Sequence, residues 1–164
     1  MTGTAHTTEQ RLTRLPLPIA LTQGDPAGVG PELAIMLWQQ RHENNVPVFT
    51  YYGSLDHIKS LCPELPVVSL DLPLEALDVF DKAFPVFDIP LKKPVVAGQL
   101  NPENGAQVLS CLNVALTHIM DGHAAALVTG PIHKAAMYES GFQFQGHTDF
   151  LASKFGKTSD DVVM

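Results

Sequence analysis

The sequence predicts a layered α/β fold built on a parallel sheet. Short apolar segments alternate with segments of helical periodicity along most of the 164 residues. Residues 124–130, AAALVTG, show no polar alternation, as expected of a strand in a parallel sheet that is covered on both faces. Glycine and proline follow two apolar segments at the strand end where open parallel sheets bind their ligands.

The first strand and helix are expected near the start of the chain. Residues 17–23, LPIALTQ, form a short apolar segment that stops at Gly24. A helix follows from Pro31, a residue suited to the first helical turn. The residues that indicate the helix by their spacing are Leu33, Met36 and Leu37.

A second strand and helix follow, and then a region rich in proline. Residues 46–53, VPVFTYYG, favour a strand, and residues 54–62, SLDHIKSLC, a short helix with Ser54 as its N-cap. Between Pro63 and Pro94, LPVVSL and FPVFDIP are expected to be extended. Their prolines favour edge strands or a separate lobe over central strands.

The clearest helix is predicted from Asn101, a potential cap, to Asp121 and Gly122, which end it. Pro102 suits its first turn. One apolar stripe runs along it, made of Val108, Leu109, Leu112, Ala115, Leu116, Ile119 and Met120.

The two ends of the chain have a different character. Residues 1–14 are polar and predict a disordered tail, so that the folded portion is expected over residues 15–164. The last residues, DDVVM, look like the start of another strand, which indicates a domain truncated at its carboxyl end.

Composition excludes several classes of function. The 17 acidic and 10 basic residues give a net charge of −7, which disfavours binding to nucleic acid. No segment predicts a secretory signal or a membrane span, so the expected location is the cytoplasm and no membrane partner is expected. Cys62 and Cys111 have no metal-ligand spacing and are interpreted as buried thiols.

Two glycine-rich turns are candidates for binding an anion. In GDPAGVGPE, Gly28 and Gly30 would let backbone amides approach a ligand, or would simply fit a tight turn. Asp25 would cap that turn or orient a ligand group. The segment has neither the GxGxxG dinucleotide fingerprint nor the Gly-Lys-Ser/Thr of a phosphate loop.

The second turn, in TGPIHKAAM, places Thr129, His133 and Lys134 beside a predicted helix start, where all could face one anion. A solvated or core-satisfied imidazole is the alternative for His133. The segment QGHTDFLASKFG then repeats the pattern, with Thr148 as a natural N-cap and His147 just before the helix, able to donate to a phosphate or carboxylate. No complete catalytic set is visible, so the catalytic residues stay unknown.

Three segments together resemble a known family. They are TQGDPAGVGPELA, PVVAGQLNPENGAQV and ALVTGPIHKAAMYESGFQFQGHTDFLA, in that order. They are similar to the 4-hydroxythreonine-4-phosphate dehydrogenases of pyridoxal phosphate (vitamin B6) biosynthesis, over the amino-terminal half of that family only. The resemblance implies the α/β/α fold of isocitrate and isopropylmalate dehydrogenases, of which this chain is an incomplete portion.

The resemblance also implies an activity. The family oxidises 4-phosphooxy-L-threonine with NAD or NADP, and the resulting β-keto acid loses CO2 to give 3-amino-2-oxopropyl phosphate. The Gly-His-Thr motif matches His147 and Thr148 as substrate-binding residues, with weaker support for His133 and Lys134.

A divalent metal (Zn, Mg or Co) and most of the cofactor contacts are expected from residues outside this chain, so the chain alone is expected to be inactive. A homodimer is implied as well. Two alternatives stay open, namely a related dehydrogenase of a phosphorylated four-carbon sugar acid or an aromatic dihydrodiol, and a non-catalytic anion-binding homologue.

Overall fold

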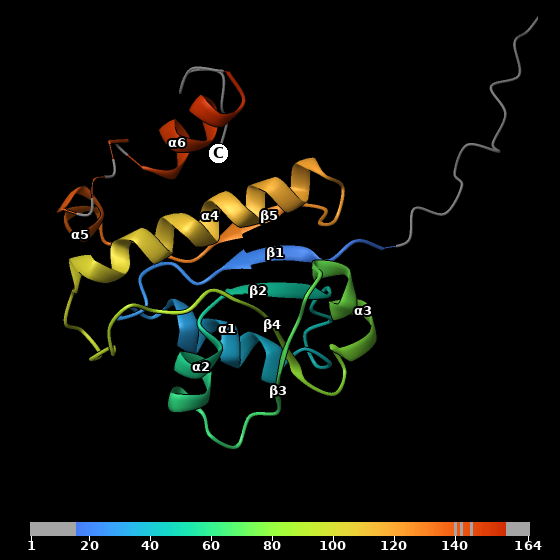
Figure 1. Ribbon diagram of the computed structural model, residues 1–164. Helices are drawn as coiled ribbons and strands as arrows, with labels where there is room; N and C mark the ends of the chain where they lie inside the picture. Colours follow the sequence, from blue (N-terminus) through green and yellow to red (C-terminus); the bar gives the residue numbers. More distant parts are fainter. Residues whose placement is uncertain (1–15, 140, 142, 145, 157–164) are drawn as a thin grey trace, which may run out of the picture.

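A five-stranded parallel sheet forms the centre of the computed structural model, which describes residues 16–139, 141, 143–144 and 146–156 (Figure 1). The strand order is β3-β4-β2-β1-β5, and all four neighbouring pairs are parallel. The strands are β1 (Ile19–Thr22), β2 (Phe49–Gly53), β3 (Val67–Ser69), β4 (Phe84–Asp88) and β5 (Leu127–Thr129). The predicted parallel α/β fold is therefore confirmed.

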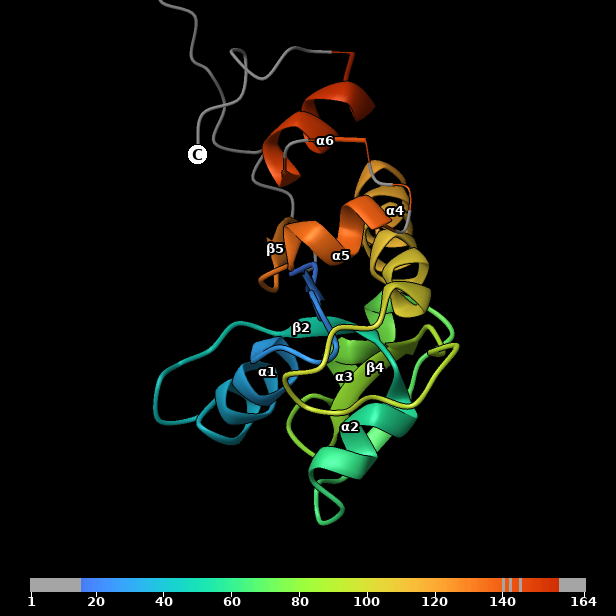
Figure 2. The same cartoon turned by 90° about the vertical axis from the view of Figure 1, so that its left-hand side faces the viewer.

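Helices cover both faces of the sheet. On one face lie α1 (Gly30–Gln39) and α2 (Leu55–Leu61), and on the other lies α4 (Gly105–Met120) (Figure 2). The remaining helices are α3 (Ala76–Val79), α5 (Lys134–Glu139) and α6 (His147–Lys154), with 3-10 turns at Pro73–Glu75 and Pro102–Asn104. No helix in the described part of the chain is both long enough and apolar enough to span a membrane.

The core between α1 and the sheet is aromatic. Phe49 of β2 contacts Phe80 and Phe84 edge to face, with ring centroids 5.0 Å and 5.8 Å away. Trp38 of α1 packs on Phe84 and donates its indole N–H to the carbonyl of Phe80 at 2.9 Å. This contact anchors α1 to the segment that precedes β4.

The helix α1 turns a different face to this core than its leucine and methionine spacing suggests. Its buried side chains include those of Ala34, Ile35 and Trp38. The three residues that marked it in the sequence are 53%, 52% and 40% exposed, in the order Leu33, Met36 and Leu37. The spacing of these residues thus predicted the position of the helix correctly, but the residues lie on its exposed side.

The long helix α4 is buried on two sides, between the sheet and the last two helices. Cys111 and Ala115 pack on Ala20 of β1 and Tyr52 of β2. Its other apolar side meets α5 and α6, through Val108, Leu112, Leu116, Met137 and Phe150. The predicted stripe is confirmed except at Met120, which is 59% exposed.

The predicted carboxyl end of α4 is confirmed, whereas the Asn101 cap belongs to the 3-10 turn before the helix, whose own N-cap is Asn104. The side-chain oxygen of Asn101 accepts from the amide of Glu103 at 3.0 Å, at the start of the 3-10 turn that leads into the helix. Asp121 is the C-cap residue, and Gly122 follows with φ of +76°, a conformation that suits glycine.

Two strand predictions were wrong in part. β4 contains Pro85 but is an internal strand between β3 and β2. Its register with β2 begins only at Val86, one residue later, so the missing N–H of the proline interrupts no pairing there. β5 is an edge strand in which Val128 is 47% exposed, so it is not covered on both faces.

Cap predictions had mixed outcomes. Ser54 caps α2 as expected, since its hydroxyl accepts from the amide of His57 at 3.3 Å. Thr148 is not an N-cap, because α6 already begins at His147, with Gly146 in the cap position. With extended backbone at Gly146, the helix starts two residues earlier than the threonine suggested. The tail over residues 1–14 and the strand start at DDVVM lie outside the described residues.

Stability measurements on two neighbouring residues of α1 test which side of this helix faces the core. We expect Ile35→Ala, at a site that is 6% exposed, to lower the free energy of unfolding by about 2–5 kcal/mol, because it leaves a cavity. Leu33→Ala on the outer side should cost less than about 1 kcal/mol. Urea unfolding of both variants is the measurement, and equal losses would contradict the assignment.

Candidate functional site

The carboxyl edge of the sheet brings the two glycine-rich turns together. β1 and β5 are neighbours, with Thr22 opposite Thr129 in the register. Beyond the strands, the amide of Gly130 donates to Thr22 at 2.8 Å, and the amide of Asp25 donates to the carbonyl of Pro131 at 2.9 Å. Two turns about 100 residues apart in sequence thereby form one surface at the strand ends.

Close backbone approach at this junction requires glycine. Gly24 has φ of +73°, and a Cβ atom there would lie 2.6 Å from the carbonyl carbon of Gly130. A Cβ on Gly130 would lie 2.8 Å from the carbonyl oxygen of Thr22. Both distances are shorter than real side chains tolerate, so these two glycines serve the packing of one turn against the other.

Three further contacts fix the turn after β1. The carboxylate of Asp25 accepts from the amide of Ala27 at 2.9 Å, so it caps its own turn. The Nε2–H of the buried His57 donates to the carbonyl of Pro26 at 2.9 Å. The amide of Gly98 donates to the carbonyl of Ala27 at 2.9 Å, which ties in the loop that precedes α4.

A buried pair of amide side chains connects the strand ends to α4. Gln23, which is 1% exposed, donates through Nε2 to Oε1 of Gln107, and its own Oε1 accepts from the amide of Ser54 at 3.2 Å. Nε2 of Gln107 donates to the carbonyl of Ile89 at 2.6 Å. The ends of β1, β2 and β4 are thus joined to α4 by one relay of hydrogen bonds, which we call the glutamine relay.

A pocket of about 390 Å³ opens beside the joined turns. Residues 25 and 27–29 of the first turn form one wall, and Pro131, Ile132 and His133 of the second turn form another. Gly98 and Leu100 complete the lining. The lining is therefore mostly apolar, with Asp25 and His133 as its ionisable residues, a combination typical of small-ligand pockets.

The sequence-derived site residues divide into two groups. His133 lies in the pocket lining, and Lys134, exposed, is the first residue of the adjacent helix α5. His147 and Thr148 open α6, which packs along the outer side of α4 (Figure 1). Thr148 is half-buried and does not line the pocket. The structure thus brings His133 to the joined turns and places the Gly-His-Thr segment on the next helix.

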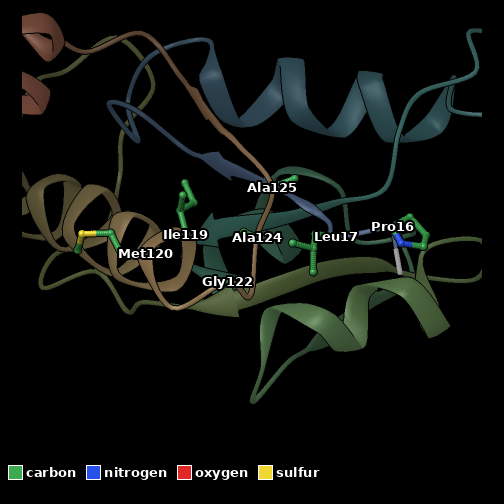
Figure 3. A pocket seen from close by; sticks show the side chains of 7 residues that line it. All are labelled: Pro16, Leu17, Ile119, Met120, Gly122, Ala124 and Ala125. Atoms are coloured by element: carbon green, nitrogen blue, oxygen red, sulfur yellow. The ribbon is translucent and has the colours of Figure 1, made fainter. Parts of the chain in front are cut away.

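A larger pocket, of about 700 Å³, lies at the opposite edge of the sheet (Figure 3). It is formed by the residues before β1, the end of α4 and the turn into β5, and its lining is Pro16, Leu17, Ile119, Met120, Gly122, Ala124 and Ala125. These side chains carry no charge and no hydrogen-bonding group. Because open parallel sheets bind their ligands at the carboxyl ends of the strands, we place the candidate site at the carboxyl edge.

The described residues do not supply a metal centre. Within these ranges, no group of three histidine, cysteine, aspartate or glutamate side chains is arranged to hold a metal ion. Burial raises the pKa of the Cys111 thiol to about 12, so this cysteine stays protonated and is not a nucleophile. The residues at this edge are suited to binding and orienting a ligand.

Comparison with known proteins assigns the family. The model of the family described as pyridoxal phosphate biosynthetic protein PdxA matches residues 45–164. The chain belongs to this family. It is 38% identical over 147 residues to a 4-hydroxythreonine-4-phosphate dehydrogenase of Zymomonas mobilis, covering 90% of this chain and 44% of the relative. A Caulobacter vibrioides enzyme of the same name is 39% identical over 135 residues, covering 82% and 40%.

Solved structures of similar proteins share the fold. A 4-hydroxythreonine-4-phosphate dehydrogenase from Klebsiella pneumoniae superposes with a TM-score of 0.72 at 26% identity, covering 84% of this chain and 44% of that one. One from Burkholderia phymatum gives 0.74 at 22% identity, covering 88% and 45%. The fold is the isocitrate and isopropylmalate dehydrogenase type, and this PdxA-family chain spans less than half the length of the relatives that it matches.

Sequence reasoning missed the residues that hold this edge together. Gln23 and Gln107 lie 84 positions apart, and no local pattern pairs them. His57 had no ligand-like spacing, and the structure shows it as a buried, hydrogen-bonded support for the first turn. The one sequence feature that could have marked Gln23 as part of this edge is its position directly after a strand and before a glycine turn.

His118 lies in an aromatic cluster away from the pocket. Nδ1 of His118 on α4 lies 3.0 Å from the hydroxyl of Tyr52, and its ring contacts Phe87 at 4.9 Å between centroids. Burial lowers the pKa of His118, and the nearby His123 lowers it further, while Asp121 acts in the opposite direction. The folded chain therefore favours a neutral imidazole at this position.

The free energy of unfolding should depend on pH through His118. Its pKa is below 6.5 in the folded state and near 6.5 in the unfolded state, so unfolding takes up protons below pH 6.5. We expect stability to fall as pH drops through 6.5 and below, and His118→Gln to flatten that part of the profile. Chemical unfolding between pH 5 and 8 would show it, and an unchanged slope in the variant would contradict the assignment.

A double-mutant cycle tests the glutamine relay. Gln23→Leu leaves Oε1 of Gln107 and the amide of Ser54 without their buried partners, so it should cost about 1–3 kcal/mol of stability. Gln107→Leu should cost less stability in the Gln23→Leu variant than in the parent chain. The difference between the two costs, which is the coupling energy of the pair, should be about 0.5–3 kcal/mol. Gln40→Leu, at an exposed position, is the control and should change stability by about 0.5 kcal/mol or less. Strict additivity of the first two changes would contradict the relay.

Proposed function

We propose that this chain supplies the substrate-binding amino-terminal portion of a 4-hydroxythreonine-4-phosphate dehydrogenase. The reaction would oxidise the hydroxyl of 4-phosphooxy-L-threonine with NAD or NADP, and loss of CO2 would give 3-amino-2-oxopropyl phosphate. Membership of the PdxA family and the names of the relatives support this proposal. The structural observation that carries it is the union of two glycine-rich turns at the carboxyl edge, with His133 in the pocket beside them.

The residues of this chain would bind and orient the substrate. A phosphate is attracted by backbone N–H groups and by nearby basic side chains, here those of His133 and Lys134. His147 and Thr148 would hold the substrate from the start of α6, as the Gly-His-Thr motif predicts. Because the chain carries a net charge of −7, such local donors are needed to hold an anion against the overall field.

The remaining catalytic groups would come from outside this chain. When bound, a divalent metal supplies Lewis acidity and a nicotinamide accepts hydride. The described residues offer no set of three metal ligands, so we expect these from the part of the family's length that this chain does not cover. A cytoplasmic homodimer with a phosphorylated small-molecule substrate completes the proposal.

One observation favours a second substrate class. A terephthalate 1,2-cis-dihydrodiol dehydrogenase from Burkholderia xenovorans superposes with a TM-score of 0.69 at 22% identity, covering 90% of this chain and 43% of that one. The same fold therefore also carries an enzyme named for a diol without phosphate. A phosphorylated sugar acid or an aromatic dihydrodiol is therefore an alternative substrate to 4-phosphooxy-L-threonine. A non-catalytic anion-binding homologue would turn over none of these compounds.

Steady-state kinetics of His147→Ala in a full-length enzyme that includes this chain would test the substrate role. We expect substrate binding to weaken by about 1–3 kcal/mol, because one hydrogen bond to a charged group is lost. That corresponds to an increase in KM of roughly 5- to 150-fold. His42→Ala, at an exposed position after α1, is the control and should leave KM unchanged.

Unchanged kinetics in His147→Ala would remove this residue from the site. Turnover of a dihydrodiol in preference to 4-phosphooxy-L-threonine would replace the proposed substrate. Reduction of NAD or NADP by 4-phosphooxy-L-threonine in the presence of the 164-residue chain alone, with divalent metal added, would contradict the expectation that ligands for the metal come from elsewhere.

A further inference from the structure

The first turn of the candidate site contains a β-turn over residues 25–28. The amide of Gly28 donates to the carbonyl of Asp25 at 3.0 Å, which closes the turn. Pro26 and Ala27 are its central residues, and Ala27 does not have the positive φ that a type II turn would need there. Aspartate at the first position and proline at the second are typical of a type I turn. Residues 25, 27 and 28 line the pocket of about 390 Å³, so this β-turn is part of its wall.

The central peptide of this β-turn is held at both of its ends. It consists of the carbonyl of Pro26 and the amide of Ala27. The amide donates to the carboxylate of Asp25 at 2.9 Å, and the carbonyl accepts from Nε2 of His57 at 2.9 Å. Because a carbonyl can only accept, Nε2 of His57 carries the hydrogen in this bond. A rotation of the peptide plane would therefore break two hydrogen bonds.

His57 is itself held in position at the start of α2. Its amide donates to the hydroxyl of Ser54 at 3.3 Å, and its carbonyl accepts from the hydroxyl of Ser60 at 2.7 Å. The amide of Ser54 in turn donates to Oε1 of Gln23 in the glutamine relay. His57 is 8% exposed and Pro26 is also buried, so their hydrogen bond is largely shielded from water. The imidazole thus connects α2 to a pocket wall that lies 31 positions earlier in the sequence.

We propose that His57 is a positioning residue for the ligand of this pocket. Its side chain does not line the pocket, so it acts through the peptide between Pro26 and Ala27. Without the Nε2–H donor, the buried carbonyl of Pro26 lacks its partner, and the β-turn shifts to regain one. The residues of the turn that line the pocket then move as well, and ligand binding weakens. This inference rests on the proposed function for the identity of the ligand.

The role of His57 needs a hydrogen-bond donor at the Nε2 position and no positive charge. Nε2 carries a hydrogen in the imidazolium and in one neutral tautomer, so the bond to Pro26 forms in either state. His57→Gln would place a side-chain amide nitrogen near the position of Nε2. His57→Asn, which is one carbon shorter, would place it near that of Nδ1. This pair of substitutions therefore separates the donor at Nε2 from the presence of a polar side chain in general.

Steady-state kinetics with 4-phosphooxy-L-threonine, in a full-length enzyme that includes this chain, test this role. We expect His57→Asn to raise KM about tenfold and to change kcat by less than about twofold, because His57 affects binding and does not touch the reacting atoms. His57→Gln should stay within about twofold of the parent KM. Ile58→Val, at a fully buried neighbouring position on α2, is the control for lost stability. It should lower the Tm and leave KM unchanged.

Amide hydrogen exchange of the 164-residue chain gives a readout that does not depend on activity. The amides of Ala27 and Gly28 donate within the β-turn, so their exchange rates report its opening. We expect His57→Asn to speed exchange at both amides about tenfold. His57→Gln and Ile58→Val should leave both rates within about twofold of the parent chain.

Two results would overturn the proposal. One is an equal effect of His57→Asn and His57→Gln on KM and on exchange, since the donor at Nε2 would then have no role. The other is an increase in KM in Ile58→Val as large as that in His57→Asn, since lost stability would then explain both. A parent enzyme that does not oxidise 4-phosphooxy-L-threonine would contradict the proposed function instead. The exchange rates of Ala27 and Gly28 then decide the role of His57 by themselves.

Discussion

The glutamine relay sets the geometry at the carboxyl edge, because it joins elements that backbone pairing alone does not hold there. Parallel strands end in loops that must leave the sheet, and their last amides and carbonyls need partners. Gln23 supplies an acceptor to the amide of Ser54 after β2, and Gln107 supplies a donor to the carbonyl of Ile89 after β4. With their mutual bond, the two side chains hold three strand ends and α4 in one arrangement. The site therefore depends on a buried polar network.

The pocket follows from this arrangement and from two glycines. Once the relay fixes the end of β1, the turn that follows has room only if Gly24 and Gly130 carry no side chain. The turns then bond to each other through Asp25 and Pro131, and His57 supports them from α2. Because the amides of these turns donate to each other's carbonyls, the shape of the pocket is fixed before a ligand arrives, which reduces the entropic cost of binding. Few ionisable side chains line this edge, so the shape of the pocket is its main contribution to ligand binding.

Local patterns predicted local structure well. Strand and helix positions, the Ser54 and Asn101 caps and the Gly122 stop followed from residues adjacent in sequence. The predictions that failed concern features decided by residues that are neighbours in space and distant in sequence. The internal position of β4 depends on where its pairing with β2 begins, and the buried side of α1 depends on which face the aromatic core offers. The relay joins residues 84 positions apart, so no window of sequence contains it.

In the described part of the chain, the edge strand β5 has an exposed side chain and no set of three metal ligands is present. A parallel sheet is normally covered on both faces, and among the described residues β5 packs on α4 while Val128, on its other face, is 47% exposed and α1 keeps an apolar outer side. A site at the carboxyl edge of such a sheet draws its groups from loops at the strand ends, and among the described residues these are the two turns, with His133 in the second, and the loop before α4. The exposed face of β5 and the sparsely lined pocket both lie beside the open edge of the described sheet. The described residues therefore hold this edge in shape through backbone turns and the glutamine relay, and few ionisable side chains reach the pocket.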